Sequence, residues 1–417
     1  MTRHIFYEAL SALNHYRLRS ALTMLSIVWG VASLVLLLAY GQGFDRALTK
    51  AFMQIGKDLV VIFSGQTSMQ AGGERSGRRI HLELDDVRAI QEGVPTIEAV
   101  SPEIRRFWPC SYNDRTRSYG VSGVYACFGR IRSAALVSGR YLTEEDVLHR
   151  RRVAVIGDNI RRELFSGLPP LGGEIKINGV RFTVIGVLEK KTQISNYSTP
   201  DDMTAFVPFT TLAGLTDAQY LEDIVLLPAS NLFRDRIVSD VRACLARAHN
   251  FNVNDTRAVE IIEWNKFLAL INGISLGLKL LLTIIGTLTL SIGAVGVINI
   301  MLVSVTERTR EIGVLKALGA RRRHILLQIL LEGLTLTLTG GFLGFVLATC
   351  LVKLIGSLPF LGAIFEDTSG RGDIYLTVSI SALLISSAIL CVVGVIAGMI
   401  PAIRAARLDP VRAMRSD

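Results

Sequence analysis

Four long apolar runs limit what this chain can fold into more than any other feature. They cover residues 21–41, 280–305, 325–356 and 376–401, and charged residues are rare within them. A helix needs roughly 20 apolar residues to cross the hydrocarbon core of a bilayer. Backbone exposed to lipid must also satisfy its own hydrogen bonds, which excludes separate strands. The sequence therefore predicts a membrane protein with four transmembrane α-helices, TM1 to TM4.

Two other interpretations of the runs are weaker. A cleaved signal peptide is the alternative for the first run, but this run is longer than a signal peptide's apolar core and has no clear small-x-small site after it. Buried helices of a soluble core are the alternative for the other three. Their length and lack of charge argue against that interpretation.

The basic residues predict the orientation in the membrane. The net charge of +9 would favour nucleic acid as a partner of a soluble protein, but here the basic residues stand beside the apolar runs. They are Arg3, Arg17, Arg19, Arg308, Arg310, Lys316, Arg321, Arg322, Arg323, Arg404, Arg407, Arg412 and Arg415. Cytoplasmic loops are enriched in such residues. We expect cytoplasmic segments at 1–20, 306–324 and 402–417, and no nucleic-acid partner.

The remaining segments then lie outside the cytoplasm. The loop 357–375 contains Arg371 against Glu366, Asp367 and Asp373, and residues 42–270 are soluble in composition. The polar start of the second membrane helix, within 271–305, is expected to continue outward as a stalk. The predicted fold class is thus four transmembrane helices with a large α+β extracytoplasmic domain between helices 1 and 2.

Four details of the membrane part are informative. Residues 4–16 have apolar residues at helical spacing, which fits either an interfacial amphipathic helix or the first turns of TM1. Glu332 lies two turns from the basic loop, where we expect it to anchor at the interface, near Arg321–Arg323 or headgroup water, rather than carry protons or substrate. Gly394 and Gly398 form a GxxxG pattern that permits close helix packing. Rows of buried polar residues are missing, which argues against a solute channel.

The outer domain shows a mixed α and β pattern in two expected lobes. Strands are predicted at 58–63, 152–156 and 204–209, the last at a sheet edge because of Pro208. Helices are predicted over 81–92, 159–165 and 231–249. The clearest signal is Glu174–Leu188, two alternating strands joined by Asn178-Gly179, which favours a type I′ hairpin.

Catalytic and metal-binding motifs are missing from the sequence. It contains no GxSxG, HExxH, CxxC or GxxxxGK[ST] pattern, so P-loop binding of ATP by these residues is excluded. Cys110, Cys127 and Cys244 fall in the outer domain. A Cys110–Cys127 disulfide and three free thiols both stay open from the sequence, as does the redox state.

The loop 306–324 contains a short amphipathic helix. Ile312, Leu315 and Leu318 recur every three residues between charged flanks, and Gly319 offers a stop. Such a helix can dock in a groove of another protein. The alternative is a solvated basic loop beside the membrane.

Residues 306–320, TERTREIGVLKALGA, resemble the signature of ABC permeases of the FtsX/MacB superfamily, the type VII mechanotransmission class. Residues 18–33, 139–146, 177–188, 207–212 and 401–415 resemble other parts of the same family. The resemblance implies a bacterial inner-membrane protein with a MacB-like periplasmic domain. It further implies a dimer, homo- or heteromeric, that docks on an ABC ATP-binding subunit through the loop helix.

The resemblance also assigns the loop residues. The ATPase-coupling residues would be Glu307, Arg310, Glu311, Ile312, Leu315, Lys316, Leu318 and Gly319, with the apolar stripe in the ATPase groove and the charges setting orientation. The chain would bind no cofactor and would not be an enzyme. ATP and magnesium would be used by a separate partner ATPase, because this sequence begins at its first membrane helix.

The implied function is ATP-driven motion of the outer domain that exports or extracts a drug, peptide or lipoprotein. A periplasmic adaptor and an outer-membrane component would be further partners, beside membrane lipid. Two alternatives remain: a membrane-anchored receptor whose outer domain controls a partner such as a cell-wall hydrolase, and a structural scaffold. The substrate and the use of an adaptor are left open by the sequence.

Overall fold

The computed structural model describes residues 17–53, 56, 58–70, 76–191, 197–230, 234–360, 372–409 and 413. The predicted amphipathic segment 4–16 and most of the loop 357–375 lie outside these residues. The chain divides into two compact units. The helical unit comprises residues 1–47, 272–360 and 373–417, and the sheet unit comprises residues 48–271 and 361–372.

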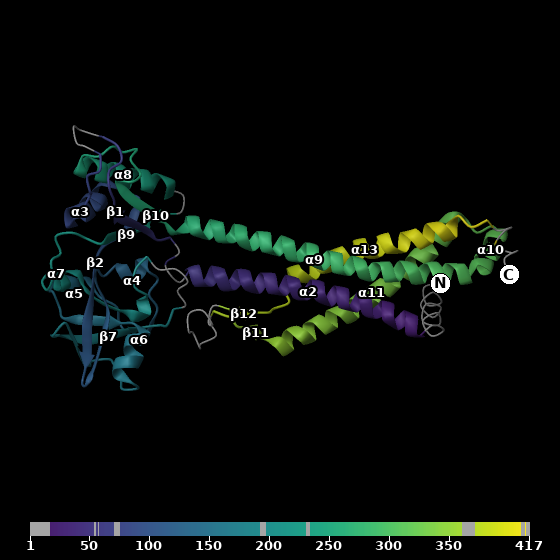
Figure 1. The fold of residues 1–417 in the computed structure, drawn as a ribbon, viewed down its shortest axis with the longest axis horizontal. Coiled ribbons are helices and arrows are strands. Elements are labelled where there is room, and N and C mark those ends of the chain that lie inside the picture. The colour runs from purple at the N-terminus through teal and green to yellow at the C-terminus, as the bar shows by residue number, and fades with distance from the viewer. Residues whose placement is uncertain are drawn as a thin grey trace. The chain divides into compact units, whose positions relative to one another are not determined.

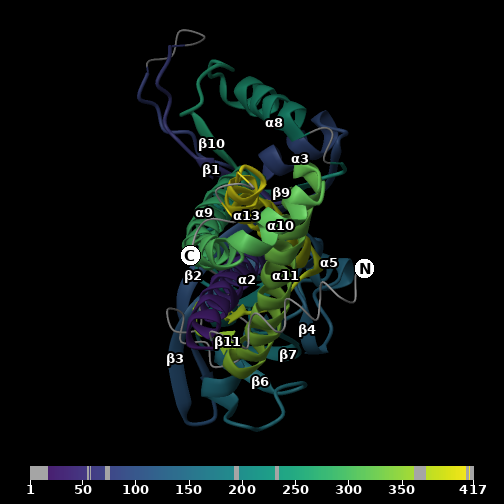
Figure 2. The same cartoon turned by 90° about the vertical axis from the view of Figure 1, so that its right-hand side faces the viewer.

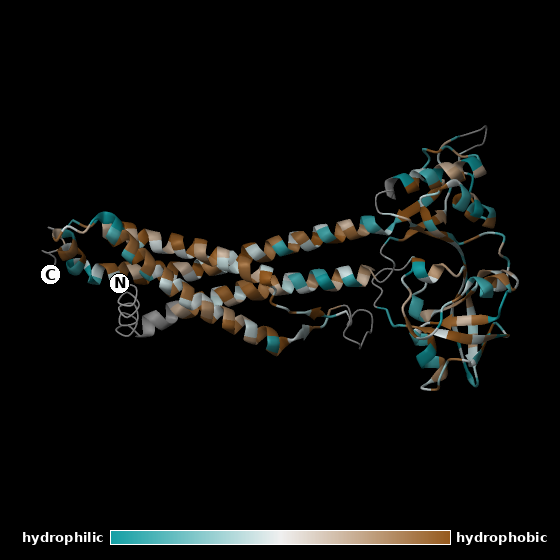
Figure 3. Cartoon of the chain, turned by 180° about the vertical axis from the view of Figure 1, so that it is seen from behind, coloured by the Kyte–Doolittle hydropathy of each residue, from teal (hydrophilic) through white to brown (hydrophobic). Residues whose placement is uncertain are grey.

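Four helices dominate the helical unit (Figure 1). They are α2 (Arg17–Met53), α9 (Trp264–Glu307), α11 (Arg322–Ile355) and α13 (Ile380–Ala406), and α2 and α9 also reach into the sheet unit. Among the described residues these are the four helices that are long and apolar enough to cross a membrane. Figure 3 shows the apolar residues along their lengths. The predicted number of membrane helices therefore fits the structure.

The helix α9 is much longer than a bilayer requires. Its 44 residues correspond to about 66 Å at 1.5 Å per residue, roughly twice the hydrocarbon thickness. The helix is continuous from Trp264, so the polar residues 272–279 belong to the same rod as the apolar residues that follow. This continuity is what a stalk requires, and the stalk itself stays a prediction.

Small residues bring the four helices together. A Cβ atom at Gly344 of α11 would lie 2.6 Å from the Val28 carbonyl oxygen of α2, and one at Gly394 of α13 would lie 2.8 Å from Thr337 Oγ1 of α11. Such distances leave no room for a side chain. The core between the helices is apolar and includes Leu34, Leu290 and Ala348. The predicted close packing through glycines is therefore present within one chain.

The remaining elements of the helical unit are short. Helix α10 (Thr309–Ala317) joins α9 to α11. Strands β11 (Ser357–Leu358) and β12 (Ile374–Tyr375) pair between α11 and α13. Beside this ribbon, Lys279 Nζ of α9 forms a 2.7 Å ion pair with Asp45 Oδ2 of α2. All five cysteines of the chain are free, so the Cys110–Cys127 disulfide does not form.

One ten-stranded mixed sheet runs through the sheet unit. Its strands are β1 (Val60–Ser64), β2 (Ile97–Tyr112), β3 (Arg115–Val124), β4 (Leu136–Gly139), β5 (Val153–Ile156), β6 (Glu174–Ile177), β7 (Val180–Leu188), β8 (Thr204–Pro208), β9 (Asp223–Pro228) and β10 (Val259–Glu263). The order is β10-β1-β9-β2-β3-β8-β5-β7-β4, and β6 pairs with β2 and β7. The pairs β3–β8 and β5–β7 are parallel, whereas the others are antiparallel.

Helices accompany the sheet within the same unit (Figure 2). They are α3 (Leu84–Gly93), α4 (Phe128–Ile131), α5 (Glu144–Leu148), α6 (Asp158–Ile160) with a π-turn (Arg161–Phe165), a 3₁₀ turn (Asp201–Met203), α7 (Phe209–Ala213) and α8 (Arg234–His249). In β1, Val60 and Ile62 join one buried cluster, whereas Leu59 and Val61, beside them, join a second. Alternate side chains point to opposite faces of a strand, so β1 is buried on both faces. The predicted α+β class is confirmed, and the division into two lobes stays a prediction.

The structure tests the local predictions for this unit. The hairpin of β6 and β7 is present, and its turn residues Asn178 and Gly179 have φ of 47° and 81°, as a type I′ turn needs. The edge position predicted for Pro208 is wrong. Strand β8 lies between β3 and β5, and Pro208 is its last residue, where a missing N–H costs the sheet little. The long hairpin of β2 and β3 was not predicted, because its arginines interrupt the apolar alternation.

A buried group of charges surrounds Asp201, in the 3₁₀ turn that directly precedes β8. Asp201 accepts a hydrogen bond of 2.5 Å from Arg132 Nη2 and forms a 3.1 Å ion pair with Lys191 Nζ. Burial alone would raise the pKa of Asp201, but the two cations outweigh burial and lower the pKa to about 2. Burial raises the pKa of the neighbouring Asp202 to about 6, helped by the nearby carboxylates of Asp158 and Asp201. The pKa values of these two adjacent carboxyl groups are thus shifted in opposite directions.

Candidate functional site

Helix α10 occupies the loop that the sequence singled out. Helix α9 ends at Glu307, and Arg308 breaks the helix with φ −91° and ψ 12° before α10 begins at Thr309. At the other end, Gly319 has φ +96°, a conformation that favours glycine. The Gly319 N–H donates to the Lys316 carbonyl, which closes the last turn. The predicted stop at Gly319 is therefore present.

The apolar residues of α10 do not all face the same way. Ile312 is 7% exposed and packs with Ile325 and Ile329 in the core of the helical unit, whereas Leu318 is 80% exposed. Leu315 lies between these extremes at 42%. Each three-residue step turns a helix by about 300°, so three such residues span about 120° of the surface. The predicted single stripe is thus divided into a buried anchor and an outward part.

The outward part includes a residue that the sequence prediction missed. Val314 is 43% exposed and stands one turn before Leu318. Glu307, Arg310 and Glu311 are also exposed on α10 and its approach. A check of helical angle from Ile312, rather than of three-residue spacing, would have found Val314. We call the exposed set Glu307, Arg310, Glu311, Val314, Leu315 and Leu318 the outward face of α10.

Lys316 is engaged inside the chain. Its ammonium donates to the carbonyl oxygens of Ala406 at 2.7 Å and Leu408 at 2.6 Å, at the C-terminal end of α13. A cation is favourable there because the last carbonyls of a helix carry partial negative charge. Burial lowers the pKa of Lys316, and the nearby Arg322 lowers it further. The structure thus gives Lys316 a structural contact, and its predicted role in orienting an ATPase stays a prediction.

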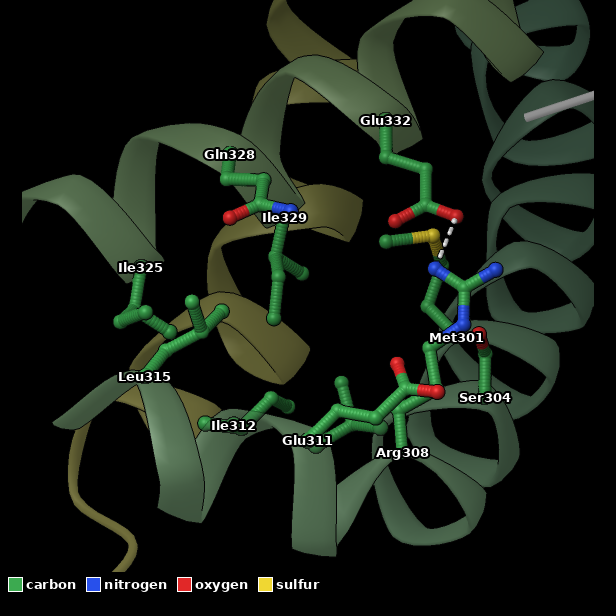
Figure 4. Close-up of a pocket in the computed structure, with 11 residues that line it drawn as sticks. Met301, Ser304, Arg308, Glu311, Ile312, Leu315, Ile325, Gln328, Ile329 and Glu332 are labelled. Atoms are coloured by element: carbon green, nitrogen blue, oxygen red, sulfur yellow. Dashed lines mark hydrogen bonds and ion pairs between the residues drawn. The ribbon is translucent and has the colours of Figure 1, made fainter. Parts of the chain in front are cut away.

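A cavity of about 300 Å³ lies between the end of α9, α10 and the start of α11 (Figure 4). Its lining includes Ile312, Leu315 and Met301, and Arg308 and Glu332 of the lining lie 3.3 Å apart, from Nη1 to Oε1. Glu332 was expected to meet Arg321–Arg323 or headgroup water. Arg308, at the break after α9, is one ion-pair partner of Glu332, and the contact with Arg321–Arg323 or headgroup water stays a prediction.

The two sides of α10 differ in their surroundings. In the described part of the chain, no cluster of His, Cys, Asp and Glu side chains could hold a metal ion. Helix α10 instead has one side anchored by Ile312 and Lys316 to α11 and α13. Its other side presents apolar residues among charges of both signs. Helix α10 therefore follows α9 directly in the chain and contacts α11 and α13 through these two residues.

Comparison with known proteins matches each part of the chain to a domain family. Residues 20–243 match the MacB-like periplasmic core domain, and residues 283–410 match the FtsX-like permease C-terminal domain. The chain is 33% identical over its whole length to the macrolide export ATP-binding/permease protein MacB of Bdellovibrio bacteriovorus, of which it covers 62%. It is 34% identical over 98% of its length to the MacB protein of a Shewanella species, of which it covers 60%.

Among solved structures, the periplasmic region of MacB from Actinobacillus actinomycetemcomitans aligns with a TM-score of 0.42 at 20% identity. That alignment covers 52% of this chain and 94% of the other. The family match does not depend on it, since the periplasmic core profile alone spans more than half of the chain. This chain therefore belongs to the family of ABC transporter permeases that combine a MacB-like periplasmic core domain with an FtsX-like permease domain.

Proposed function

We propose that this ABC transporter permease converts ATP hydrolysis by a partner ATPase into motion of its periplasmic domain, which exports or extracts a substrate at the outer face of the membrane. The outward face of α10 is the contact for the ATPase. The observation that carries the proposal is the divided helix: Leu318 is 80% exposed, while Ile312 on the same helix is buried among α11 residues. A docking surface needs an exposed apolar residue such as Leu318, and transmission of motion to the bundle needs a buried contact such as that of Ile312.

The ATP-binding domain comes from outside this sequence, which has no P-loop motif. Relatives are described as ATP-binding/permease proteins, and this chain spans about three fifths of their length. In our proposal a separate subunit supplies ATP hydrolysis and its magnesium, and the permease binds no cofactor. Glu307, Arg310 and Glu311 orient that subunit by charge pairs, which mainly give specificity and association rate.

Two copies of the permease act together in this proposal. Helix α9 exposes Leu281, Ile284, Leu288, Ile292 and Val295, which follow a spacing of three and four residues. This spacing is typical of a helix that packs against another helix over a long distance. A paired α9 would let two ATPases pull symmetrically. The proposal applies to a homodimer and to a heterodimer alike.

The substrate class follows from the relatives by analogy. They are named macrolide exporters, and we extend to this chain the broader class of amphiphilic drugs, peptides and lipoproteins. The membrane helices pack through glycines against neighbouring backbones, as Gly344 does against Val28. A bundle packed in this way favours a lever over a solute pore. A periplasmic adaptor and an outer-membrane component are the further partners we propose.

Leu318→Asp tests the coupling. The full chain is co-expressed with the ATP-binding subunit encoded in the same genome, and co-purification and ATPase stimulation are measured in nanodiscs. The charge falls in an apolar contact, so we expect at least a tenfold loss of stimulation with unchanged membrane insertion and thermal unfolding. Leu148→Asp is the matched control, because Leu148 is 76% exposed in the sheet unit.

Normal stimulation by Leu318→Asp would contradict the α10 contact. Failure of the wild-type chain to bind any ATP-binding subunit would instead favour the alternative function. In that alternative the chain is a receptor whose outer domain controls a partner such as a cell-wall hydrolase. Capture of such an enzyme from the outer side, without ATPase stimulation, would be its positive result.

A further inference from the structure

A second cavity of the helical unit is separate from the one that contains the Arg308–Glu332 pair. It has a volume of about 600 Å³ and is formed by the end of α9, the start of α10, the end of α13, and Leu408, Asp409 and Ala413. Its apolar wall includes Leu302, Ile400 and Ile403. Volumes of this size accommodate small organic ligands. The cavity shares no lining residue with the first one.

Two arginines stand at the rim of this cavity. Arg404 and Arg407 are one turn apart on α13, so their side chains share a face of the helix. Both are exposed, and neither has an ion-pair partner among the described residues. Asp409 is the acidic residue of the lining, which leaves two positive charges against one negative charge. The rim therefore favours an anion.

The end of a helix normally repels an anion, and here that effect is offset. The last carbonyls of α13 would present partial negative charge to the cavity. Lys316 donates to the carbonyl of Ala406, the last residue of α13, and to that of Leu408 just beyond it. The contact brings a third cation to this end of the helix and removes free carbonyl acceptors. The local field is thus more positive than the lining alone suggests.

Along α13, exposed apolar residues are followed by basic residues, which matches the acyl chains and the anionic headgroup of a lipid. Ile396 and Ile400 are 59% and 49% exposed on the spanning helix, and Arg404 and Arg407 come one and two turns later. The candidate membrane span ends at Ala406, so the arginines lie where headgroups begin. Guanidinium groups bind phosphate oxygens in pairs, and basic pockets between membrane helices are suited to anionic headgroups.

We propose that this cavity binds an anionic phospholipid of the cytoplasmic leaflet, with the phosphodiester on Arg404 and Arg407 and acyl chains along Ile400, Ile403 and Leu302. The proposal rests on the placement of the helices in a membrane and not on ATPase coupling. The bound lipid would lie against α10 and α13, the two elements that Lys316 joins. It would therefore stabilise the part of the bundle next to the outward face of α10.

Binding to the delipidated full chain in detergent tests the site, with phosphatidylglycerol and phosphatidylcholine as probes. We expect saturable binding of phosphatidylglycerol and at least tenfold weaker binding of phosphatidylcholine. Each basic residue near an anionic lipid contributes about fivefold, so Arg404→Gln with Arg407→Gln should weaken binding about 25-fold. Arg321→Gln with Arg323→Gln removes the same charge outside the cavity and should change binding by less than about twofold.

Several results would overturn the proposal. Equal binding by the Arg404/Arg407 double variant and wild type would remove the arginines from the site, and equal loss in the control would reduce the effect to net charge. Equal affinity for the two phospholipids would remove the anion preference. Competition by inorganic phosphate or glycerophosphoglycerol as strong as by the intact lipid would assign a soluble phosphate site. If the double variant does not fold, the comparison of the two lipids on wild-type protein still decides.

Discussion

At the residue scale, the charges in this protein have local partners that define what each can do. Lys316 is the plainest case, because its ammonium binds two carbonyl oxygens at the end of α13 and so is held inside the chain. Arg310, six residues earlier, is exposed, and no ion pair to a described residue involves it. Two basic residues of one short helix thus have different roles. One contacts the end of α13, and the other is exposed, which our proposal uses for the contact with the ATPase.

Lys316→Met should loosen the end of α13 without removing the outward face of α10. The variant loses two charge-assisted hydrogen bonds, each of which contributes about 1.5–3 kcal/mol. Hydrogen exchange followed by mass spectrometry should show at least tenfold faster exchange over residues 403–408. Arg310→Met is the control, with unchanged exchange there. Unchanged exchange in Lys316→Met would show that the contact contributes no stability.

The neighbours Asp201 and Asp202 provide a second contrast at this scale. Asp201→Asn leaves Arg132 buried without its charge partner, so we expect a loss of about 3–5 kcal/mol at pH 7. Asp202→Asn keeps the acceptor for the Lys191 N–H and removes a carboxylate whose pKa is raised to about 6. It should be neutral or stabilising at pH 7. Chemical unfolding of the full chain in detergent measures both, and equal losses would contradict the assigned charge states.

The pH dependence has the opposite sign for the two residues. A raised folded-state pKa makes the contribution of Asp202 most favourable below pH 4 and less favourable as the pH rises through about 6. A lowered folded-state pKa makes the contribution of Asp201 fully favourable above pH 4, and it is lost as the pH falls toward 2. Asp202→Asn should therefore flatten the stability profile between pH 4 and pH 6.

At the element scale, the four long helices approach one another closely at small residues. Gly344 of α11 faces the Val28 carbonyl of α2 at a distance that excludes a side chain. Gly277 of α9 has no neighbouring atom within 4 Å of where a Cβ would stand. Both glycines lie inside helices, so they share the entropic cost that glycine carries there. Their packing differs, because Gly344 has no room for a side chain and Gly277 has open space around it.

Gly344→Ala and Gly277→Ala should therefore act in opposite directions. The first forces α11 away from α2, which costs about 1–3 kcal/mol, and the second should stabilise α9 by about 0.5–1 kcal/mol. Thermal unfolding of the full chain in detergent ranks the two against wild type. A neutral Gly344→Ala would show that α2 and α11 are not in contact in the membrane.

At the scale of the whole molecule, the chain joins a membrane bundle to a large sheet domain through single continuous helices. Helix α9 belongs to both units, and so does α2. A continuous helix transmits displacement without a hinge, which is the property that our functional proposal uses. The proposal also requires the sheet unit and α10 to lie on opposite sides of the membrane.

Cysteine labelling tests that requirement. Ser166→Cys lies at an exposed position of the sheet unit, and Ala317→Cys lies at an exposed position of α10. With the five native cysteines replaced by serine, a membrane-impermeant maleimide should label the first and not the second in intact spheroplasts, because basic residues flank α10. Labelling of Ala317→Cys should appear only after permeabilisation. Equal labelling of both before permeabilisation would contradict the predicted topology.

The sequence by itself determined the membrane helices, the sheet-and-helix class of the inserted domain, the Asn178-Gly179 turn and the loop helix. Each of these depends on local composition, spacing or backbone preference, since lipid, water and tight turns select residues one segment at a time. Only the tertiary structure decided that β8 is internal, that Glu332 pairs with Arg308, and that Val314 faces outward while Ile312 is buried. These facts depend on which distant segments pack together, as α11 and α13 do against α10, and a local pattern carries no record of that contact.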